Sequence, residues 1–263
     1  MSERRLGQKE SEATKARGAP RGRKPQSKAL RAAKEAAYRS HILAVAEQVF
    51  AAQGFAHTKM QDIAREAGMS LGTLYQSYPS KQDLYRGVLI ARDGAMLESV
   101  MRHGQAVLQA PQSIEHLLWL QGVHLQFLLE HPDYLRMQLQ EGYAWYHDAA
   151  RPSSEEQQMW TRGMGVIEHV FRWGMDRGWL VPGQPPDEAR MLMAVQQTRL
   201  ANWVSDGMQA AQSTVIARIR ADFVRLFCQP GVAADLLEAD GSALNAATVQ
   251  RLAAIDQGTA PPP

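Results

Sequence analysis

The sequence predicts an all-α fold in which a three-helix head precedes a larger helical body. Apolar residues recur at a spacing of three and four along most of the chain, as on one face of a helix. Ser, Thr or Pro stands at the start of many of these segments, and Gly stands at the end of several. No segment of strand length shows a convincing alternation of apolar and polar residues. At 263 residues, the chain is long enough to bury a sizeable core.

Composition narrows the function classes. The longest apolar runs, such as Leu117–Leu120, are too short to cross a bilayer, and the charged N-terminus predicts no secretory signal. The single cysteine, Cys228, excludes a disulfide within the chain and a cysteine-rich zinc site. We therefore expect no membrane partner and a reducing cytoplasm, with Cys228 as a buried, inert thiol.

Charge is unevenly distributed along the chain. Residues 1–34 hold eleven Lys and Arg against three Glu, a net charge of +8, whereas the whole chain has a net charge of only +2. A basic arm on an acidic remainder indicates a polyanionic partner such as nucleic acid. A solubilising disordered tail is the alternative.

The basic arm has too few large apolar side chains to fold, so we predict that residues 1–34 are disordered. Within it, residues 20–25 (PRGRKP) resemble an AT-hook core. Arg21, Arg23 and Lys24 are candidates for binding a narrow A·T minor groove. Diffuse attraction to phosphates is the other reading.

The head is predicted at residues 35–90. Its first helix carries Ile42, Ala46 and Phe50 on one face and ends at Gly54. Residues 58–61 resemble a capping box that starts a second helix, which ends at Gly68. Ser70 caps a third, short helix, and residues 80–83 start a long helix that runs to about residue 109.

The body is predicted at residues 91–228, followed by a C-terminal tail at 229–263. Its helices start near Ser113, Pro132, Ser153, Pro185 and Ser213 and end near His131, Tyr146, Gly178, Met208 and Phe227. Two weak amphipathic stretches in the tail, Val232–Glu238 and Leu244–Ile255, are candidates for further helices.

Residues 58–81 have the spacing of a helix-turn-helix, in which the second helix enters the major groove of DNA. An ordinary helical hairpin has the same spacing. The basic arm upstream favours the DNA-binding interpretation.

Residues 55–84, FAHTKMQDIAREAGMSLGTLYQSYPSKQDL, resemble the signature of TetR-type (TetR/AcrR) transcriptional regulators. The likeness extends over about residues 38–90, roughly a fifth of the chain. It implies a three-helix DNA-binding head, a helical ligand-binding body and a homodimer.

The resemblance assigns DNA contacts to the turn and the recognition helix. Matching positions are Gln61, Ser70, Leu71, Gly72, Thr73, Tyr75, Gln76, Ser77 and Lys81. Gln76 suits the adenine edge in the major groove, and Lys81 suits a phosphate. Gln61 and Leu71 stand where many members carry Arg and Lys, so the basic arm is expected to compensate.

Large, soft side chains are concentrated between residues 115 and 175, as in an apolar pocket. Candidate ligand contacts are Trp119, Phe127, Trp145, Tyr146, Trp160 and Met164, for a small apolar or aromatic effector. The last two long helices carry the apolar residues Met193, Leu200, Val204, Ile216, Ile219 and Phe223, expected at a dimer interface. Core packing is the alternative for both sets.

The sequence gives little indication of a catalytic or metal-binding site. Residues 68–72 match G-x-S-x-G, but that motif requires a strand before the serine, and a helix is predicted there. No two of the eight histidines are spaced as metal ligands on one helix, and no glycine-rich phosphate loop is present. We expect no catalytic site, no cofactor and no metal.

The sequence thus predicts a cytoplasmic, nucleoid-associated, ligand-responsive repressor that binds a palindromic operator in double-stranded DNA as a homodimer. An activating or architectural DNA-binding protein, controlled by a protein partner and without a small-molecule ligand, is the alternative.

Overall fold

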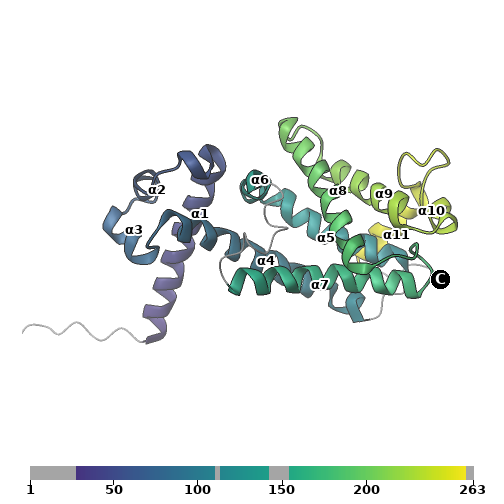
Figure 1. The fold of residues 1–263 in the computed structure, drawn as a ribbon, viewed down its shortest axis with the longest axis horizontal. Coiled ribbons are helices and arrows are strands. Elements are labelled where there is room, and N and C mark those ends of the chain that lie inside the picture. Colours follow the sequence, from purple (N-terminus) through teal and green to yellow (C-terminus); the bar gives the residue numbers. More distant parts are fainter. Residues whose placement is uncertain (1–27, 110–112, 142–153, 259–263) are drawn as a thin grey trace, which may run out of the picture. The chain divides into compact units, whose positions relative to one another are not determined.

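A computed structural model describes residues 28–109, 113–141 and 154–258, and within these ranges the fold is all-α, as predicted (Figure 1). Two isolated β-bridges, Leu180–Cys228 and Leu237–Leu244, are the only extended pairings there. The helices are α1 Lys28–His57, α2 Met60–Glu66, α3 Leu71–Ser77, α4 Lys81–Gln109, α5 Ile114–Glu130, α6 Pro132–Glu141, α7 Ser154–Asp176, α8 Pro185–Ser205, α9 Gln212–Phe227, α10 Pro230–Leu236 and α11 Ala246–Asp256.

Helix α1 begins inside the segment that was expected to be disordered. Residues 28–34 are helical, which corrects the predicted boundary at residue 34. The reason is local, because residues 28–37 are rich in Ala, Leu, Arg, Lys and Glu, the strongest helix formers. Side chains from Ala29 to Tyr38 are all exposed, and the chain divides after Tyr38 into a second compact unit, Arg39–Pro263.

The core of the head has the predicted apolar faces. Ile42 and Phe50 of α1, Ile63 of α2 and Leu74 of α3 are fully buried in one cluster with residues of α4. Met137 of α6 completes this cluster, so a body helix contributes to the head's core.

In the head, the predicted helix-end signals at Gly54, Ser70 and residues 80–83 are confirmed. Gly54 has a φ of +76° and interrupts the regular helix of α1. The Ser70 hydroxyl accepts the Thr73 N–H at 3.1 Å. The Ser80 hydroxyl donates to the Asp83 carboxylate at 2.7 Å and accepts the Asp83 N–H at 3.1 Å.

The prediction of a capping box at residues 58–61 was wrong. The N-cap of α2 is Lys59, without a side-chain cap. The Thr58 hydroxyl, 1% exposed, instead donates to the Gly54 carbonyl at 2.8 Å. Thr58 therefore supplies a hydrogen-bond donor to a carbonyl near the end of α1. Its side chain is directed into the core and away from the start of α2, so it cannot cap α2.

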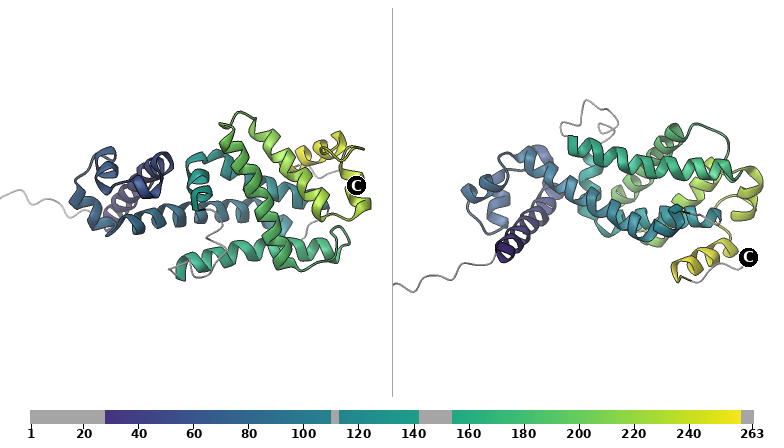
Figure 2. Two further views of the ribbon diagram at one scale, coloured as in Figure 1. Left: turned by 45° about the horizontal axis from the view of Figure 1, so that its top comes forward. Right: turned by 90° about the horizontal axis from the view of Figure 1, so that it is seen from below.

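In the body, α5 packs against α4, α6, α9 and α11, and α8 packs against α7 and α9 (Figures 1 and 2). Two buried clusters fill the interior, one around Leu118 and Phe171 and the other around Leu125 and Tyr134. No helix of the described residues is long and apolar enough to cross a membrane.

The C-terminal segment, expected as a tail, packs into the body through both of its amphipathic stretches. Leu236, Leu244 and Leu252 are buried in the same cluster as Leu118. The Arg251 guanidinium donates to the Glu115 carboxylate of α5 at 2.6 Å. Helices α10 and α11 are therefore part of the body's core.

The apolar stripe that was predicted to form the dimer interface lies mostly in the chain's own core. Leu200 is 2% exposed, and Ile216, Ile219 and Phe223 are buried as well. Met193 and Val204 are half-buried and pack against the same clusters. For Leu200, Ile216, Ile219 and Phe223 the interface prediction was wrong, because these side chains fill the space that α5 and α7 also border.

Candidate DNA-binding surface and body cavity

A tight turn joins α2 to α3. Gly68 has a φ of +65°, a conformation that residues with a Cβ rarely adopt. The Gly68 N–H donates to the Arg65 carbonyl at 3.1 Å, and the Met69 N–H donates to the Ala64 carbonyl at 2.9 Å. These bonds close the end of α2 and set the direction of α3.

Helix α3 is fixed by one buried side chain and exposes the opposite face. Leu74 is fully buried between α1, α2 and α4. Of the predicted DNA contacts, Gln61, Ser70, Gly72, Tyr75 and Gln76 are exposed, and Leu71, Thr73, Ser77 and Lys81 are half-buried. Every member of the predicted set from Gln61 to Lys81 is therefore at least partly accessible, whereas Arg21, Arg23 and Lys24 lie outside the described residues.

Tyr75 and Gln76 are the most accessible large side chains of α3. The Tyr75 ring is 43% exposed, and within the described residues neither side chain has a hydrogen-bond partner. The start of the helix is more constrained, because the Ser70 and Thr73 hydroxyls lie 2.7 Å apart and are hydrogen-bonded. The helix thus offers two unpaired polar groups on a fixed backbone.

Lys81 is engaged within the chain. Its ammonium donates to the carbonyls of Phe55 at 2.6 Å, Ala56 at 3.3 Å and Thr58 at 3.0 Å. An ammonium has three donors, so all of them are accounted for. The role that the resemblance implied, a contact to phosphate, would require at least one of these bonds to break.

A cavity of about 800 Å³ lies in the body and reaches the end of α1. Its lining comes from α4, α5, α6, α7, α8 and α9, together with residues 54–57. Cavities of this size accommodate drug-sized molecules. Most of the described lining is apolar and includes Leu117, Leu120, Met159, Met193 and Phe223.

The cavity contains only part of the predicted ligand set. Trp160 and Met164 line it. Trp119 instead donates its indole N–H to Asp256 of α11 at 3.3 Å, and the ring of Phe127 stacks on His131 at 4.2 Å. The described lining therefore lacks Trp119, which ties α5 to α11, and Phe127, whose ring also meets Tyr134 of α6 edge-on, whereas Trp145 and Tyr146 lie outside the described residues.

The sequence reasoning missed the polar groups of the cavity. Gln121 and His124 of α5 and Gln196 of α8 line it, and each has a buried polar atom without a hydrogen-bond partner in the described structure. Burial lowers the pKa of His124 to about 4. The available signal was the spacing of Gln121 and His124, three residues apart in a helix that is otherwise rich in leucine.

Comparisons with known proteins identify the head. Residues 42–88 match the model of bacterial regulatory proteins of the tetR family. This segment is a TetR-type DNA-binding domain. The match covers under a fifth of the chain, and no curated protein matches the sequence.

Solved structures share the TetR-type fold. A TetR-family regulator of Shewanella is 21% identical, with a TM-score of 0.56, over 73% of this chain and 98% of its own. SmeT, the repressor of a Stenotrophomonas maltophilia multidrug efflux pump, is 18% identical, with a TM-score of 0.54, over 74% of this chain and 92% of its own. A regulator of Saccharomonospora viridis solved with choline is 18% identical, with a TM-score of 0.56, over 74% of this chain and 99% of its own.

In this TetR-type domain the G-x-S-x-G sequence forms the turn of the helix-turn-helix. A helix precedes Ser70, and the serine hydroxyl is bonded to Thr73 at the start of α3. The strand that holds a hydrolase nucleophile is replaced by α2.

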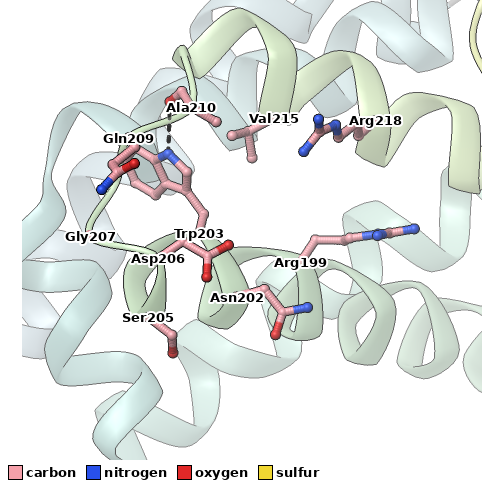
Figure 3. A pocket seen from close by; sticks show the side chains of 10 residues that line it. All are labelled: Arg199, Asn202, Trp203, Ser205, Asp206, Gly207, Gln209, Ala210, Val215 and Arg218. Atoms are coloured by element: carbon pink, nitrogen blue, oxygen red, sulfur yellow. Dashed lines mark hydrogen bonds between the residues drawn. The ribbon is translucent and has the colours of Figure 1, made fainter.

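A second hollow, about 840 Å³, lies between the end of α8 and the start of α9. Figure 3 shows Arg199 from α8 and Arg218 from α9 beside it. Trp203 closes one end, where its indole N–H donates to the Ala210 carbonyl at 2.9 Å. The described lining is mainly polar, in contrast to that of the body cavity.

Proposed function

We propose that the protein is a homodimeric repressor that binds a palindromic operator and releases it when a small apolar or aromatic effector occupies the body cavity. The observation that carries this proposal is the lining of the cavity. Residues 54–57, which directly precede the helix-turn-helix, line it together with six body helices. An effector there would touch the segment that supports the DNA-binding helices.

On the DNA side, Tyr75 and Gln76 are proposed to meet the duplex from the exposed face of α3. A glutamine amide can donate and accept at once, which suits the N6 and N7 atoms of adenine. The tyrosine hydroxyl can donate to a phosphate or a base edge. The basic arm adds attraction that does not depend on sequence.

Helix α4 is the proposed coupling element. Its first residue, Lys81, bonds to carbonyls at the end of α1, and further along it Tyr85, Leu89 and Met96 line the cavity. The Tyr85 hydroxyl also donates to the Met137 carbonyl of α6 at 3.4 Å. An effector that displaces these side chains would shift α4 and, with it, the separation of two heads in a dimer.

Two structural neighbours support effector binding. SmeT has been solved as a complex with triclosan, and the Saccharomonospora viridis regulator was solved with choline. A repressor of this kind works on cytoplasmic, nucleoid DNA and needs no enzymatic activity, cofactor or metal.

Fluorescence anisotropy with DNA from upstream of the protein's own gene tests the proposal. Nanomolar binding to one palindromic fragment, and not to a shuffled fragment, is expected at physiological salt. Small apolar compounds should reverse the binding. Binding that no compound affects, but that a protein partner changes, would instead support an activating or architectural role.

A further inference from the structure

The unpaired polar atoms of the body cavity belong to three side chains on two helices. Both amide atoms of Gln121, the Nε2 atom of His124 and the Oε1 atom of Gln196 are buried without a hydrogen-bond partner among the described residues. Leaving a buried polar group unpaired costs about 1–3 kcal/mol. Unpaired groups are rare in native proteins, and the three residues that carry these atoms all line one cavity.

The same cavity has little net charge among its described lining residues. Arg86 and Asp93, both of α4, carry opposite charges. Asp93 also accepts a hydrogen bond from Tyr134 and one from Gln138. His124 is neutral at physiological pH, because burial keeps its pKa near 4. An ionised ligand beside Gln121 would lose water without gaining an unpaired counter-charge.

Building on the effector site proposed above, we propose that the effector is an uncharged molecule with an apolar body and one amide-like group. In such a group a hydrogen-bond donor stands beside an acceptor. Gln121 provides the matching acceptor and donor once its buried amide turns toward the ligand, and Gln196 and His124 provide further partners in the same way. The leucine and methionine side chains around them bind the apolar body.

The chemistry of the three side chains distinguishes this ligand class from hydrocarbons, esters and charged compounds. A hydrocarbon would leave every one of the buried atoms unpaired. An ester can accept but cannot donate, so the Gln121 and Gln196 oxygens would stay unpaired. A carboxylate or an ammonium would add a buried charge. A primary amide satisfies both atoms of Gln121 at once.

Two matched series of compounds test the ligand class. Decanamide, methyl decanoate, decanoate and decylammonium share a straight chain, and 4-phenylbutanamide with its ester, acid and amine counterparts shares an aromatic one. Full-length protein is titrated with each compound by calorimetry, and release of the operator is followed by anisotropy. At least one amide should bind about tenfold or more tightly than its ester, acid and amine counterparts.

Gln121→Leu and Gln196→Leu test the residues. Each should weaken amide binding about tenfold, yet raise the unfolding midpoint of the free protein, because an unpaired buried amide is removed. Gln126→Leu is the matched control on the same helix, since the Gln126 amide donates to Glu130 at 2.7 Å and does not line the cavity. The control should leave amide binding unchanged.

Charged compounds that bind as tightly as the amides would overturn the ligand class, and so would unchanged amide affinity in both leucine variants. In either case, release of the operator by any compound would leave the proposed effector function standing. If no compound binds, the ligand class and the effector site both fail, and operator binding measured on the same protein shows whether the DNA-binding function survives.

Discussion

The Lys81 ammonium donates a hydrogen bond to the Phe55 carbonyl at 2.6 Å and also lies 4.4 Å from the centre of the Phe55 ring. One side chain thus joins the start of α4 to the end of α1. The carbonyls at a helix end lack partners within the helix, and a cation over an aromatic ring is an attractive contact. Lys81 therefore stabilises the junction between the head and the cavity.

Lys81→Met should destabilise the protein by about 1–3 kcal/mol, because carbonyls at the end of α1 lose a charged donor. Operator affinity should fall as well, since the recognition helix loses support, but its salt dependence should stay unchanged. Urea unfolding and anisotropy at several salt concentrations measure both effects. Lys59→Met, at an exposed lysine, is the control and should leave stability unchanged. A salt slope lowered by about one, at full stability, would instead assign Lys81 to a phosphate.

Removal of residues 1–27 should weaken binding to every DNA sequence and flatten the dependence of log affinity on log salt. The segment carries most of the arm's excess positive charge, so fewer counterions are released on binding without it. The cut precedes Lys28, where α1 begins, so that the helix stays whole. A greater loss on operators with A·T-rich flanks than with G·C-rich flanks would indicate minor-groove binding. Full affinity and slope would show that the arm is an inert tail.

Gln76→Ala should relax discrimination at one base-pair position by about 1–3 kcal/mol. Tyr75→Ala should weaken operator binding while helicity stays intact, because its ring is outside the core. Competition against operators changed one base pair at a time measures both effects. Gln48→Ala, at an exposed position on α1, is the control. Equal losses on operator and random DNA for Gln76→Ala would mean that the amide touches only the backbone.

Stability should depend on pH through His124. Its pKa is lowered by burial from 6.5 to about 4 in the folded protein, so between these values the unfolded chain binds a proton that the folded chain does not. The stability contributed by the neutral ring is complete above about pH 6.5 and is lost as pH falls toward 4. At pH 5 the expected loss is about 2 kcal/mol.

Urea unfolding of the protein and of His124→Gln at pH 7.5 and pH 5 measures this loss. The pKa of His116 is also lowered by burial, so the difference between the two proteins isolates His124. An equal loss of stability in both would show that the ring of His124 is protonated as readily in the folded protein as in the unfolded chain.

The head could be predicted closely because its signals are local. These signals depend on neighbours within a few residues along the chain. They are the helical spacing of the buried Ile42 and Phe50, the positive φ at Gly54 and Gly68, and the Ser70 cap. Helix existence in the body followed from the same patterns.

Which face of a body helix meets which neighbour did not follow from the pattern. Leu200 and Ile219 recur at the same spacing whether they line a subunit interface or an internal core. Trp119 was assigned to a pocket by its chemistry, but its contact to Asp256 depends on a helix 137 residues further along the chain. Gln121 was overlooked because its spacing of three residues from His124 is the same whether the two side chains line a cavity or face solvent.

The dimer interface is the last prediction. Leu200→Glu should unfold the body rather than separate subunits, because a carboxylate would be buried without a partner in the chain's own core. Leu226 of α9 is 50% exposed, and Met191 of α8 is 47% exposed, so the outer faces of these helices are available for a second copy.

In a two-fold dimer formed by those faces, Leu226→Glu would place two charges in one interface and should dissociate the subunits with little loss of helicity. Sedimentation, thermal unfolding and anisotropy on a palindrome with half-sites about 34–36 Å apart measure the outcome. Binding should fall toward that of a single half-site. A stable Leu200→Glu monomer, together with an unchanged Leu226→Glu dimer, would instead show that the interface is formed by the apolar stripe that contains Leu200. An operator without two-fold symmetry would contradict paired heads altogether.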